Sequence, residues 1–334
     1  MTIKYLIFLF ALLTKAVFPQ YLSVNDYKAK SIFEIVDEKE ANVNIGLWAL
    51  IIANEFDKTV DIKSNQKKLD DMSEEIKRML AGRESDMDKF LAVKMFLYEA
   101  GEWNDYQPFR YDLDDPLGKQ LKNQLLTTYL ETRKGNCVSM PTLFLALMER
   151  VDPDIKLLGV KAPLHLFCRF KDRQTGDVWN VESTNGGNPA RNHWYVERFS
   201  IEQTALDNKL YLNDLSKKEF IAELIGTLIS KERKAGRYEK ALKYAQLSLK
   251  LSPNSDVGLV QKGALLAEIG NEKLGKGNLS DEDKTYYKTE SEKYINKAIA
   301  LGWKPETKES REEYLKSVNE ELKKEIRRKN EYNY

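Results

Sequence analysis

A surplus of charge of one sign is missing from this sequence. Among its 334 residues, Lys and Arg number 53 and Asp and Glu number 52. Such a balanced chain lacks the electrostatic driving force with which proteins usually bind polyanions, so we exclude nucleic-acid binding. The sequence has only two histidines and two cysteines, and it shows no cluster of metal ligands and no phosphate-binding glycine loop. We therefore expect no metal ion and no cofactor.

Long apolar runs are also missing, apart from one at the N-terminus. Residues 5–13 are apolar, follow Lys4, and precede Thr14 and Ala16, the small residues expected before a cleavage site. This pattern predicts that residues 1–16 are a signal peptide and that the protein is exported to the periplasm or the extracellular space. A buried N-terminal helix or a membrane-tethering segment is the alternative. No later segment reaches the roughly 20 apolar residues that span a bilayer, so we expect no integral membrane segment after signal removal.

The remaining length is typical of two domains of roughly 150 residues each. Apolar residues make up 42% of the chain and charged residues 31%, which allows a real core and argues against wholesale disorder. In the first domain, residues 17–205, apolar residues recur at helical spacing, and a stretch rich in Asp, Pro and Tyr at residues 103–118 predicts a long loop. The helices predicted from this spacing cover residues 43–52, 65–80, 90–98 and 121–132.

One of the two cysteines precedes a further helical pattern. Apolar residues recur at helical spacing from Met140 onward, and Pro141 is tolerated only near the start of a helix. Cys137 is therefore predicted at a helix N-terminus, where unpaired backbone N–H groups and the helix dipole favour a thiolate. A lone cysteine is more often a small buried hydrophobe, so this position alone does not establish a nucleophile. Glu149 and Arg150, further along the same helix, are expected to be solvated.

Three β-strands are expected after this helix, at residues 157–160, 164–170 and 178–182. The last two strands form a hairpin around a polar turn. If that turn spans four residues, 172–175, then residues 165, 167 and 169 pair with residues 182, 180 and 178. The side chains of His165 and Glu182 would then face each other on one side of the sheet.

The second cysteine is expected in the core. Cys168 lies an odd number of residues from His165 in the same strand, so its side chain points to the opposite face of the sheet. An exported protein meets an oxidising compartment, in which two cysteines could pair. A disulfide requires both cysteines on the same side within about 7 Å, whereas Cys137 is expected to face His165. We therefore predict two free thiols.

A cysteine, a histidine and a carboxylate together form an activated thiol. The histidine takes the proton of the thiol, and the acid fixes the tautomer of the histidine and supports the imidazolium. Cys137, His165 and Glu182 are therefore the candidate catalytic residues. His193 is the rival base, but it stands in an irregular polar stretch without an assignable partner. We interpret it as a surface or loop residue.

The second half of the chain changes to helical runs separated by Gly and Pro. Within residues 222–253, the positions of Gly236, Tyr238, Ala241 and Pro253 match the spacing of a 34-residue helix–turn–helix repeat. A second unit begins after this one and contains an insertion at residues 274–283, and the stretch 312–328 is the candidate closing helix. We therefore predict a tetratricopeptide-repeat-like helical domain over residues 215–334, in which neighbouring units bury each other's apolar faces.

Several of these segments resemble the transglutaminase-like superfamily. The resemblance rests on residues 130–147, in which the block RKGNC at residues 133–137 is the most specific part, on residues 159–165, and on residues 181–187. It points to the SirB-type bacterial branch, in which such a domain is followed by tetratricopeptide repeats. It covers roughly residues 40–305.

The resemblance implies an α+β fold of the papain or transglutaminase type, with helices packed on a small antiparallel sheet, followed by an all-α repeat domain. It places the nucleophile of the family on Cys137, its histidine on His165, and its acid on Glu182, where Asp is usual. Leu164 stands where Gly usually precedes the histidine. We therefore expect a thiol hydrolase or acyltransferase acting on an amide or ester of a peptide or protein substrate. The alternative is a non-catalytic interaction protein that binds a protein partner through its repeats.

Overall fold

The computed structural model describes residues 31–277 and 279–309, together with residues 311, 312, 315, 316, 320 and 323. The predicted signal peptide at residues 1–16 lies outside the described residues, as does most of the predicted closing helix at residues 312–328. The chain from Ser31 onward forms one compact unit. None of its described helices combines the length and the apolar character needed to cross a bilayer.

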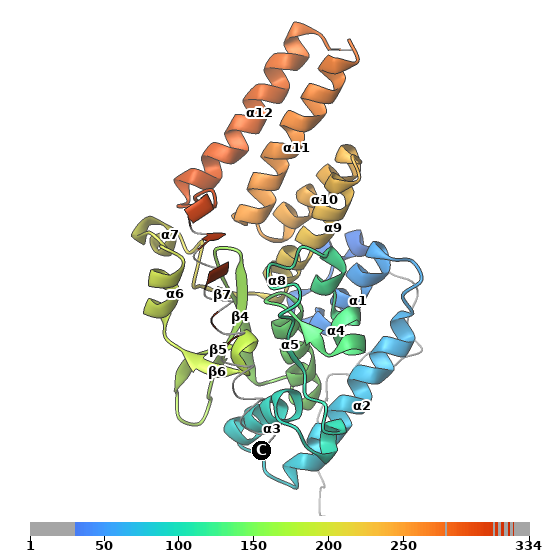
Figure 1. Ribbon diagram of the computed structural model, residues 1–334, viewed down its shortest axis with the longest axis vertical. Helices are drawn as coiled ribbons and strands as arrows, with labels where there is room; N and C mark the ends of the chain where they lie inside the picture. Colours follow the sequence, from blue (N-terminus) through green and yellow to red (C-terminus); the bar gives the residue numbers. More distant parts are fainter. Residues whose placement is uncertain are drawn as a thin grey trace, which may run out of the picture. The chain divides into compact units, whose positions relative to one another are not determined.

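Helices and one larger sheet make up the described chain (Figure 1). The α-helices are α1 (Ile45–Phe56), α2 (Ile62–Leu80), α3 (Asp86–Tyr98), α4 (Leu126–Thr132), α5 (Ser139–Val151), α6 (Asn192–Arg198), α7 (Gln203–Asp207), α8 (Lys217–Leu224), α9 (Gly226–Lys234), α10 (Tyr238–Leu251), α11 (Asp256–Gly275) and α12 (Asp281–Ala300). The 3-10 helices are η1 (Ile32–Val36), η2 (Glu40–Asn42), η3 (Glu102–Asn104), η4 (Leu121–Gln124) and η5 (Ser183–Asn185). The strands are β1 (Arg110–Tyr111), β2 (Lys134–Gly135), β3 (Lys156–Ala162), β4 (His165–Lys171), β5 (Val178–Glu182), β6 (Asn188–Ala190) and β7 (Asp214–Leu215).

The helices predicted before Cys137 are present, with changes at their ends. α1 is buried over residues 45–53 because its own apolar side chains point to every side of the helix. α2 is amphipathic and ends at Leu80, after which Ala81 takes the left-handed conformation. The helix predicted over residues 121–132 is interrupted, because Leu125 is extended between η4 and α4.

The larger sheet has five antiparallel strands in the order β6-β5-β4-β3-β7. β3 and β4 form a tight hairpin that the sequence did not indicate. The expected hairpin of β4 and β5 is present, but its predicted register is wrong by two residues: Arg169 pairs with Asn180, because the connecting loop spans residues 172–177. A shift of two leaves every side chain on its predicted face, since strand residues alternate with a period of two.

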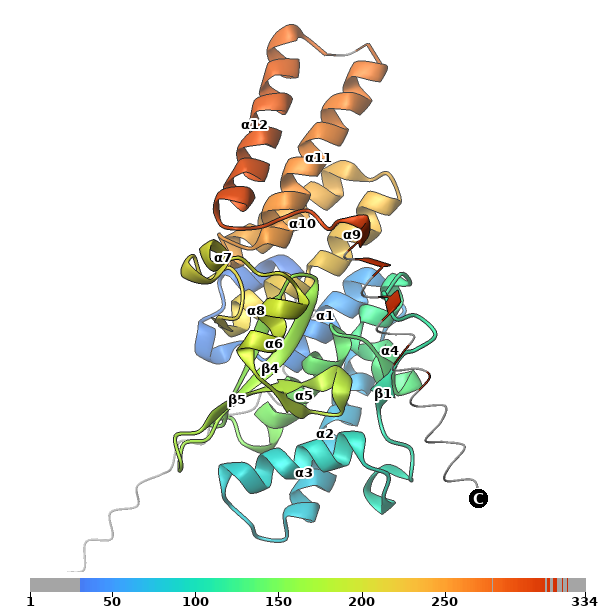
Figure 2. The ribbon, with the colours of Figure 1, turned by 60° about the vertical axis from the view of Figure 1, so that its left-hand side comes forward.

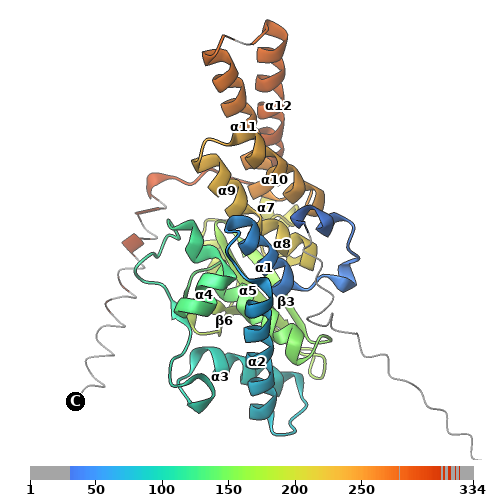
Figure 3. The same ribbon diagram turned by 90° about the vertical axis from the view of Figure 1, so that its right-hand side faces the viewer.

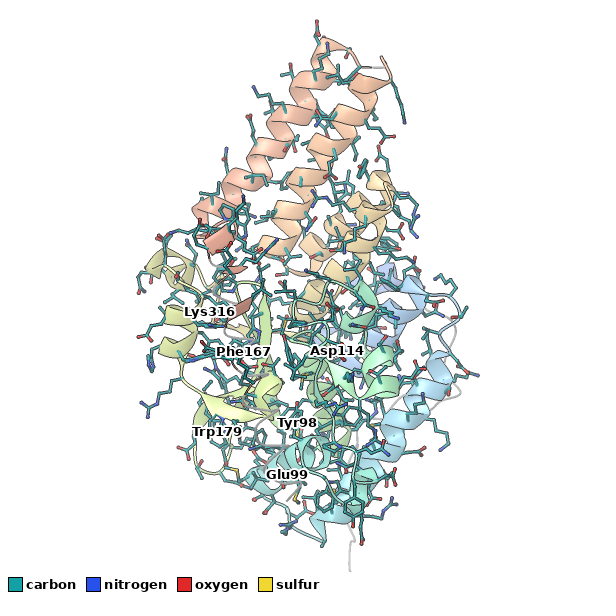
Figure 4. The ribbon with its side chains drawn as sticks, in the orientation of Figure 1. Tyr98, Glu99, Asp114, Phe167, Trp179 and Lys316 are labelled. Atoms are coloured by element: carbon teal, nitrogen blue, oxygen red, sulfur yellow. The ribbon has the colours of Figure 1, made fainter. Side chains whose placement is uncertain are left out.

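The sheet lies between two layers of helices, with α5 on one side and α6 and α7 on the other (Figure 1). On the α5 side, Phe170 packs at 4.7 Å against the ring of Phe90 from α3. On the other side, Phe167, labelled in Figure 4, stacks at 4.0 Å on Tyr195 of α6. The sheet therefore presents one face to each layer, as the alternation of residues in β4 predicts.

The chain from α8 to α12 continues as packed helices. α10 packs on α9 and on α11, and α11 and α12 lie side by side (Figure 2). α1 contacts α8 and α9, which Figure 3 shows beside it. Phe33 of η1 stacks on Tyr244 of α10 with ring centroids 5.8 Å apart. The predicted boundary between residues 17–205 and 215–334 is thus crossed by packing contacts, and the boundaries themselves stay a prediction.

A buried ion cluster joins the sheet to the later helices. Lys161 Nζ in β3 lies 3.0 Å from Glu223 Oε1 of α8 and 2.7 Å from Asp256 Oδ1 of α11. Tyr211 donates its hydroxyl to the other oxygen of Asp256, and Ser255 donates its hydroxyl to Glu223. Burial lowers the pKa of Lys161, but the two carboxylates more than offset this and raise it above its usual value. The ammonium therefore stays charged inside the protein.

Arg150 is buried and the side chain of Glu149 is only 12% exposed, so the expectation that they are solvated is wrong. Arg150 is 7% exposed and donates to Asp70 Oδ1 at 2.9 Å. Gly46 of α1 makes room for it, since a Cβ there would lie 2.7 Å from the guanidinium. Glu149 pairs with Lys217 at 2.6 Å, and burial raises the pKa of its carboxyl. The reason is that α1, α2 and α8 enclose this end of α5, which the periodicity of α5 alone does not show.

Candidate active site

Cys137 lies in the short turn between β2 and α5. The side chain of Asn136 organises this turn, because its Oδ1 accepts the backbone N–H groups of Val138 at 2.9 Å and Ser139 at 3.2 Å. The helix itself begins at Ser139, so Cys137 precedes its first residue by two positions. The thiol is partly exposed and free. A nucleophile needs this combination of fixed backbone and access.

The backbone behind Cys137 is tightly packed at Gly135. A Cβ at this position would lie 2.6 Å from Tyr129 Cδ2 and 2.9 Å from Met140 Cγ. Atoms of these types do not approach so closely, so any larger residue would push β2 away from α4 and α5. Glycine at position 135 thereby allows the turn that carries Cys137 to lie directly on the core.

His165 and Glu182 meet on the sheet, as the sequence predicts. His165 opens β4 and Glu182 ends β5, and His165 Nε2 donates to Glu182 Oε2 at 2.8 Å. The two side chains are 10% and 7% exposed. Because of the shifted register, Glu182 lies diagonally across from His165 instead of directly opposite, a separation that the long glutamate side chain spans.

The other side of the imidazole faces the thiol. The interaction with the Cys137 side chain contributes to the raised pKa of the His165 imidazole, and Cys137 Sγ lies 3.7 Å from the carbonyl oxygen of Leu164. Because Nε2 is held by Glu182, Nδ1 is the ring nitrogen left for the thiol. The structure therefore brings all three candidate residues, from the turn before α5, from β4 and from β5, into one chain of contacts.

The charges of this chain are mutually stabilising. Burial lowers the pKa of His165, but the negative charge of Glu182 and the hydrogen bonds with Cys137 and Glu182 raise it to about 10. Burial raises the pKa of Glu182, but the imidazolium and the hydrogen bonds from His165 and Thr184 bring it below its usual value. At neutral pH the histidine is therefore protonated and the glutamate ionised.

Sequence reasoning missed the residues that hold the acid and the imidazole. Thr184 donates its backbone N–H and its hydroxyl to Glu182 Oε1, at 3.1 and 2.6 Å. Tyr195 donates its hydroxyl to Glu182 Oε2 at 2.9 Å, and Phe199 stacks on His165 with ring centroids 5.6 Å apart. Thr184 could have been found as a hydroxyl residue two positions after a candidate acid. Tyr195 and Phe199 carry no such local signal.

His193 and Cys168 lie apart from these contacts. His193 is exposed, as expected, but its stretch is the helix α6 and not irregular, because Tyr195 anchors that helix on the sheet. Cys168 is fully buried, with Sγ 3.9 Å from the carbonyl oxygen of Pro141. Both cysteines are free, so the prediction of two free thiols is confirmed. Within the described part of the chain, no group of three or more His, Cys, Asp or Glu is arranged to hold a metal ion.

Fold and site together have the layout of a thiol-dependent acyl-transfer protein: a cysteine before a helix, a histidine on the adjoining sheet and an acid on the neighbouring strand. Residues 63–226, from α2 to the start of α9, match the family model described as Transglutaminase-like superfamily. This part of the chain is therefore a transglutaminase-like superfamily domain, and it contains Cys137, His165 and Glu182. The searches of curated proteins and of solved structures give no significant match.

Proposed function

We propose that this protein is a thiol hydrolase or acyltransferase acting on an amide or ester through Cys137, His165 and Glu182. The observation that supports it most directly is the imidazole of His165, which is hydrogen-bonded at 2.8 Å to the buried Glu182 carboxylate and interacts with the Cys137 side chain. The transglutaminase-like superfamily is typically protease-like or acyltransferase-like, which agrees with this chemistry. The SirB-type branch remains part of the proposal.

The proposed reaction has two halves. In the first, the Cys137 thiolate attacks the carbonyl carbon of the substrate, a carbon–sulfur bond forms, and the carbonyl oxygen becomes an oxyanion. The His165 imidazolium then gives its proton to the leaving nitrogen or oxygen as the scissile bond breaks, leaving a thioester. In the second half, water or an amine loses a proton to His165 and attacks the thioester, which releases the acyl product and restores the thiolate.

Stabilisation of the oxyanion falls to the turn that carries the thiol. Asn136 Oδ1 accepts the N–H groups of Val138 and Ser139. Within residues 31–277, no acceptor bonds the N–H of Cys137 itself. A free backbone donor adjacent to the nucleophile is the type of group that binds a developing oxyanion. Cys137 would thus supply both the sulfur and a hydrogen-bond donor.

The test is the pH dependence of Cys137 alkylation by iodoacetamide, with the modified cysteine located by mass spectrometry. An ordinary thiol with a pKa near 8.5 reacts on the order of 100-fold more slowly at pH 6 than at pH 8, because few molecules are thiolates. Beside the His165 imidazolium, we expect the rate at pH 6 to stay within about threefold of that at pH 8. Cys168 is fully buried and should remain unlabelled.

Two variants control this measurement. His165→Ala should restore the steep dependence on pH, whereas His193→Ala, on the exposed face of α6, should leave the flat profile unchanged. Cys137→Ala should abolish hydrolysis of an activated ester such as p-nitrophenyl acetate. A steep profile in the wild-type protein, or one that His165→Ala does not alter, would show that Cys137 is structural.

The helices after residue 215 are proposed to bind a protein partner. A groove of about 320 Å³ between α11 and α12 is lined by Leu274, Leu279 and Tyr287 among others. A full-length Leu274→Glu variant that still captures the same partner from a lysate as the wild-type protein would remove this groove from consideration. Export directed by residues 1–16 is likewise a proposal, and retention of the unprocessed protein inside the cell would contradict it.

A further inference from the structure

Leu164 combines a strained backbone with an exposed apolar side chain. It lies in the tight turn between β3 and β4 with φ at 56°, in the left-handed region that glycine enters freely and a leucine does not. Its side chain is 74% exposed. Leu212 has a similar φ of 57°, but it is 9% exposed and belongs to the core beside α6 and α7. Burial of the apolar side chain therefore accounts for a leucine with positive φ at position 212, but not for the one at position 164.

The position of Leu164 relates its side chain to the proposed chemistry. Its carbonyl oxygen lies 3.7 Å from Cys137 Sγ, and the next residue is His165. The exposed side chain thus projects from a turn that touches the reactive sulfur. A substrate carbonyl approaching Cys137 must pass close to this turn.

Two further side chains next to the thiol and the imidazole are apolar. Val138 follows Cys137 directly and is half-buried. Phe199 is half-buried and stacks on His165, with centroids 5.6 Å apart. Together with Leu164 they give the site an apolar rim. A charged substrate group placed against this rim would lose its hydration without gaining a polar partner.

We propose that Leu164 is a specificity-determining residue that contacts an apolar side chain or acyl chain next to the carbonyl attacked by Cys137. The inference rests on the proposed thiol function. Contact with such a group removes apolar surface of both partners from water, which favours binding. Strained backbone conformations are retained at functional sites when the residue contributes to function. Contact with the substrate would be the contribution that retains a leucine at position 164.

The test compares two thiol-directed probes with the same reactive group, N-acetyl-leucyl chloromethyl ketone and N-acetyl-glycyl chloromethyl ketone. In each, Cys137 displaces chloride and forms a carbon–sulfur bond, so only the apolar side chain differs. The wild-type protein should react faster with the leucyl probe. Leu164→Gly should lower the ratio of the two rate constants by about tenfold, the scale of discrimination given by an apolar contact.

A matched variant separates this effect from relief of backbone strain. Ala81, at the end of α2, is also exposed and has φ at 49°. Both Leu164→Gly and Ala81→Gly should raise the melting temperature, but only the change at position 164 should alter the ratio. Leu164→Asn, which tolerates the left-handed conformation, should lower the ratio as well.

Each outcome has one meaning. An unchanged ratio in Leu164→Gly and Leu164→Asn, with Cys137 still labelled rapidly in the wild-type protein, would overturn the role of Leu164 and leave the thiol function intact. An equal fall in Ala81→Gly would also overturn it. If neither probe labels Cys137 in the wild-type protein, the thiol function fails and this inference fails with it.

Discussion

The charge on Glu182 controls the protonation of His165. Glu182→Gln keeps the shape of the side chain but removes the negative charge that raises the pKa of the imidazole. The pKa of His165 is raised from 6.5 to about 10, a difference of 3.5. At 1.36 kcal/mol for each pKa unit, this corresponds to roughly 5 kcal/mol in favour of the protonated ring. Burial remains in the variant and lowers the pKa, whereas the interaction with Cys137 still raises it, so the pKa of His165 should fall below its parent value of about 10.

The chain offers an unusually clear assay, because it contains only two histidines. In a His193→Ala background, one imidazole remains to be followed by NMR. The chemical shifts of His165 should be constant from pH 5.5 to 8.5 in the parent protein, since its pKa is about 10. In Glu182→Gln the same resonances should move with pH within this range, because removal of the negative charge lowers the pKa of His165. A parent midpoint near 6.5, or a variant that does not titrate in this range, would refute the reasoning.

The same pKa difference sets the dependence of stability on pH. The pKa of His165 is higher in the folded protein than in the unfolded chain, so its contribution is complete below pH 6.5 and is lost as the pH rises through 10. In urea denaturation, the free-energy advantage of the parent over Glu182→Gln should be several kcal/mol at pH 6 and should shrink toward pH 10. If this advantage does not change with pH, the stabilisation by the His165–Glu182 pair does not come from the protonation of His165.

Two further substitutions, each with a control variant, test the buried charge and the packing near the site. Lys161→Met leaves Glu223 and Asp256 buried without their ammonium and should lower the free energy of unfolding by about 3–5 kcal/mol. Lys171, whose side chain is 39% exposed, pairs with Asp214, and Lys171→Met should cost less than about 1 kcal/mol. Equal losses of stability in Lys161→Met and Lys171→Met, measured by urea denaturation, would contradict this expectation. Gly135→Ala should cost about 1–3 kcal/mol by overpacking against Tyr129. A Cβ at position 275 would meet no atom within 4 Å, so Gly275→Ala should change stability by less than about 1 kcal/mol. Equal melting temperatures of Gly135→Ala and Gly275→Ala would argue against overpacking at position 135.

The pairing of His165 with Glu182 was predictable because it depends on the parity of strand positions. The predicted loop was two residues too short, yet an even shift keeps both side chains on one face. Cys137 was predictable from the helix that follows it, although α5 begins two residues later. These features depend on local patterns, which a single sequence displays.

Features built from distant segments were not predictable in this way. Tyr195 reaches Glu182 only because α6 folds over the sheet, and no spacing in its own stretch indicates that contact. Arg150 lies on a polar position of its helix, but α1 and α2 cover that position, and Gly46 admits its guanidinium. Whether a polar residue is solvated or enclosed depends on elements far apart in the chain, as the contact of Arg150 with Asp70 at a separation of 80 residues illustrates.

The Lys161 cluster also constrains the order in which the protein matures. Glu223 and Asp256 follow Lys161 by 62 and 95 residues, so a ribosome produces β3 well before either carboxylate exists. Until α11 has been made, the growing chain cannot bury the Lys161 ammonium against both partners, and an unpaired buried charge is costly. Lys161 lies close to the turn that contacts Cys137, so the surroundings of the Cys137 thiol should be assembled late, in chains that are nearly complete. Prematurely terminated chains would then carry the cysteine without a finished site.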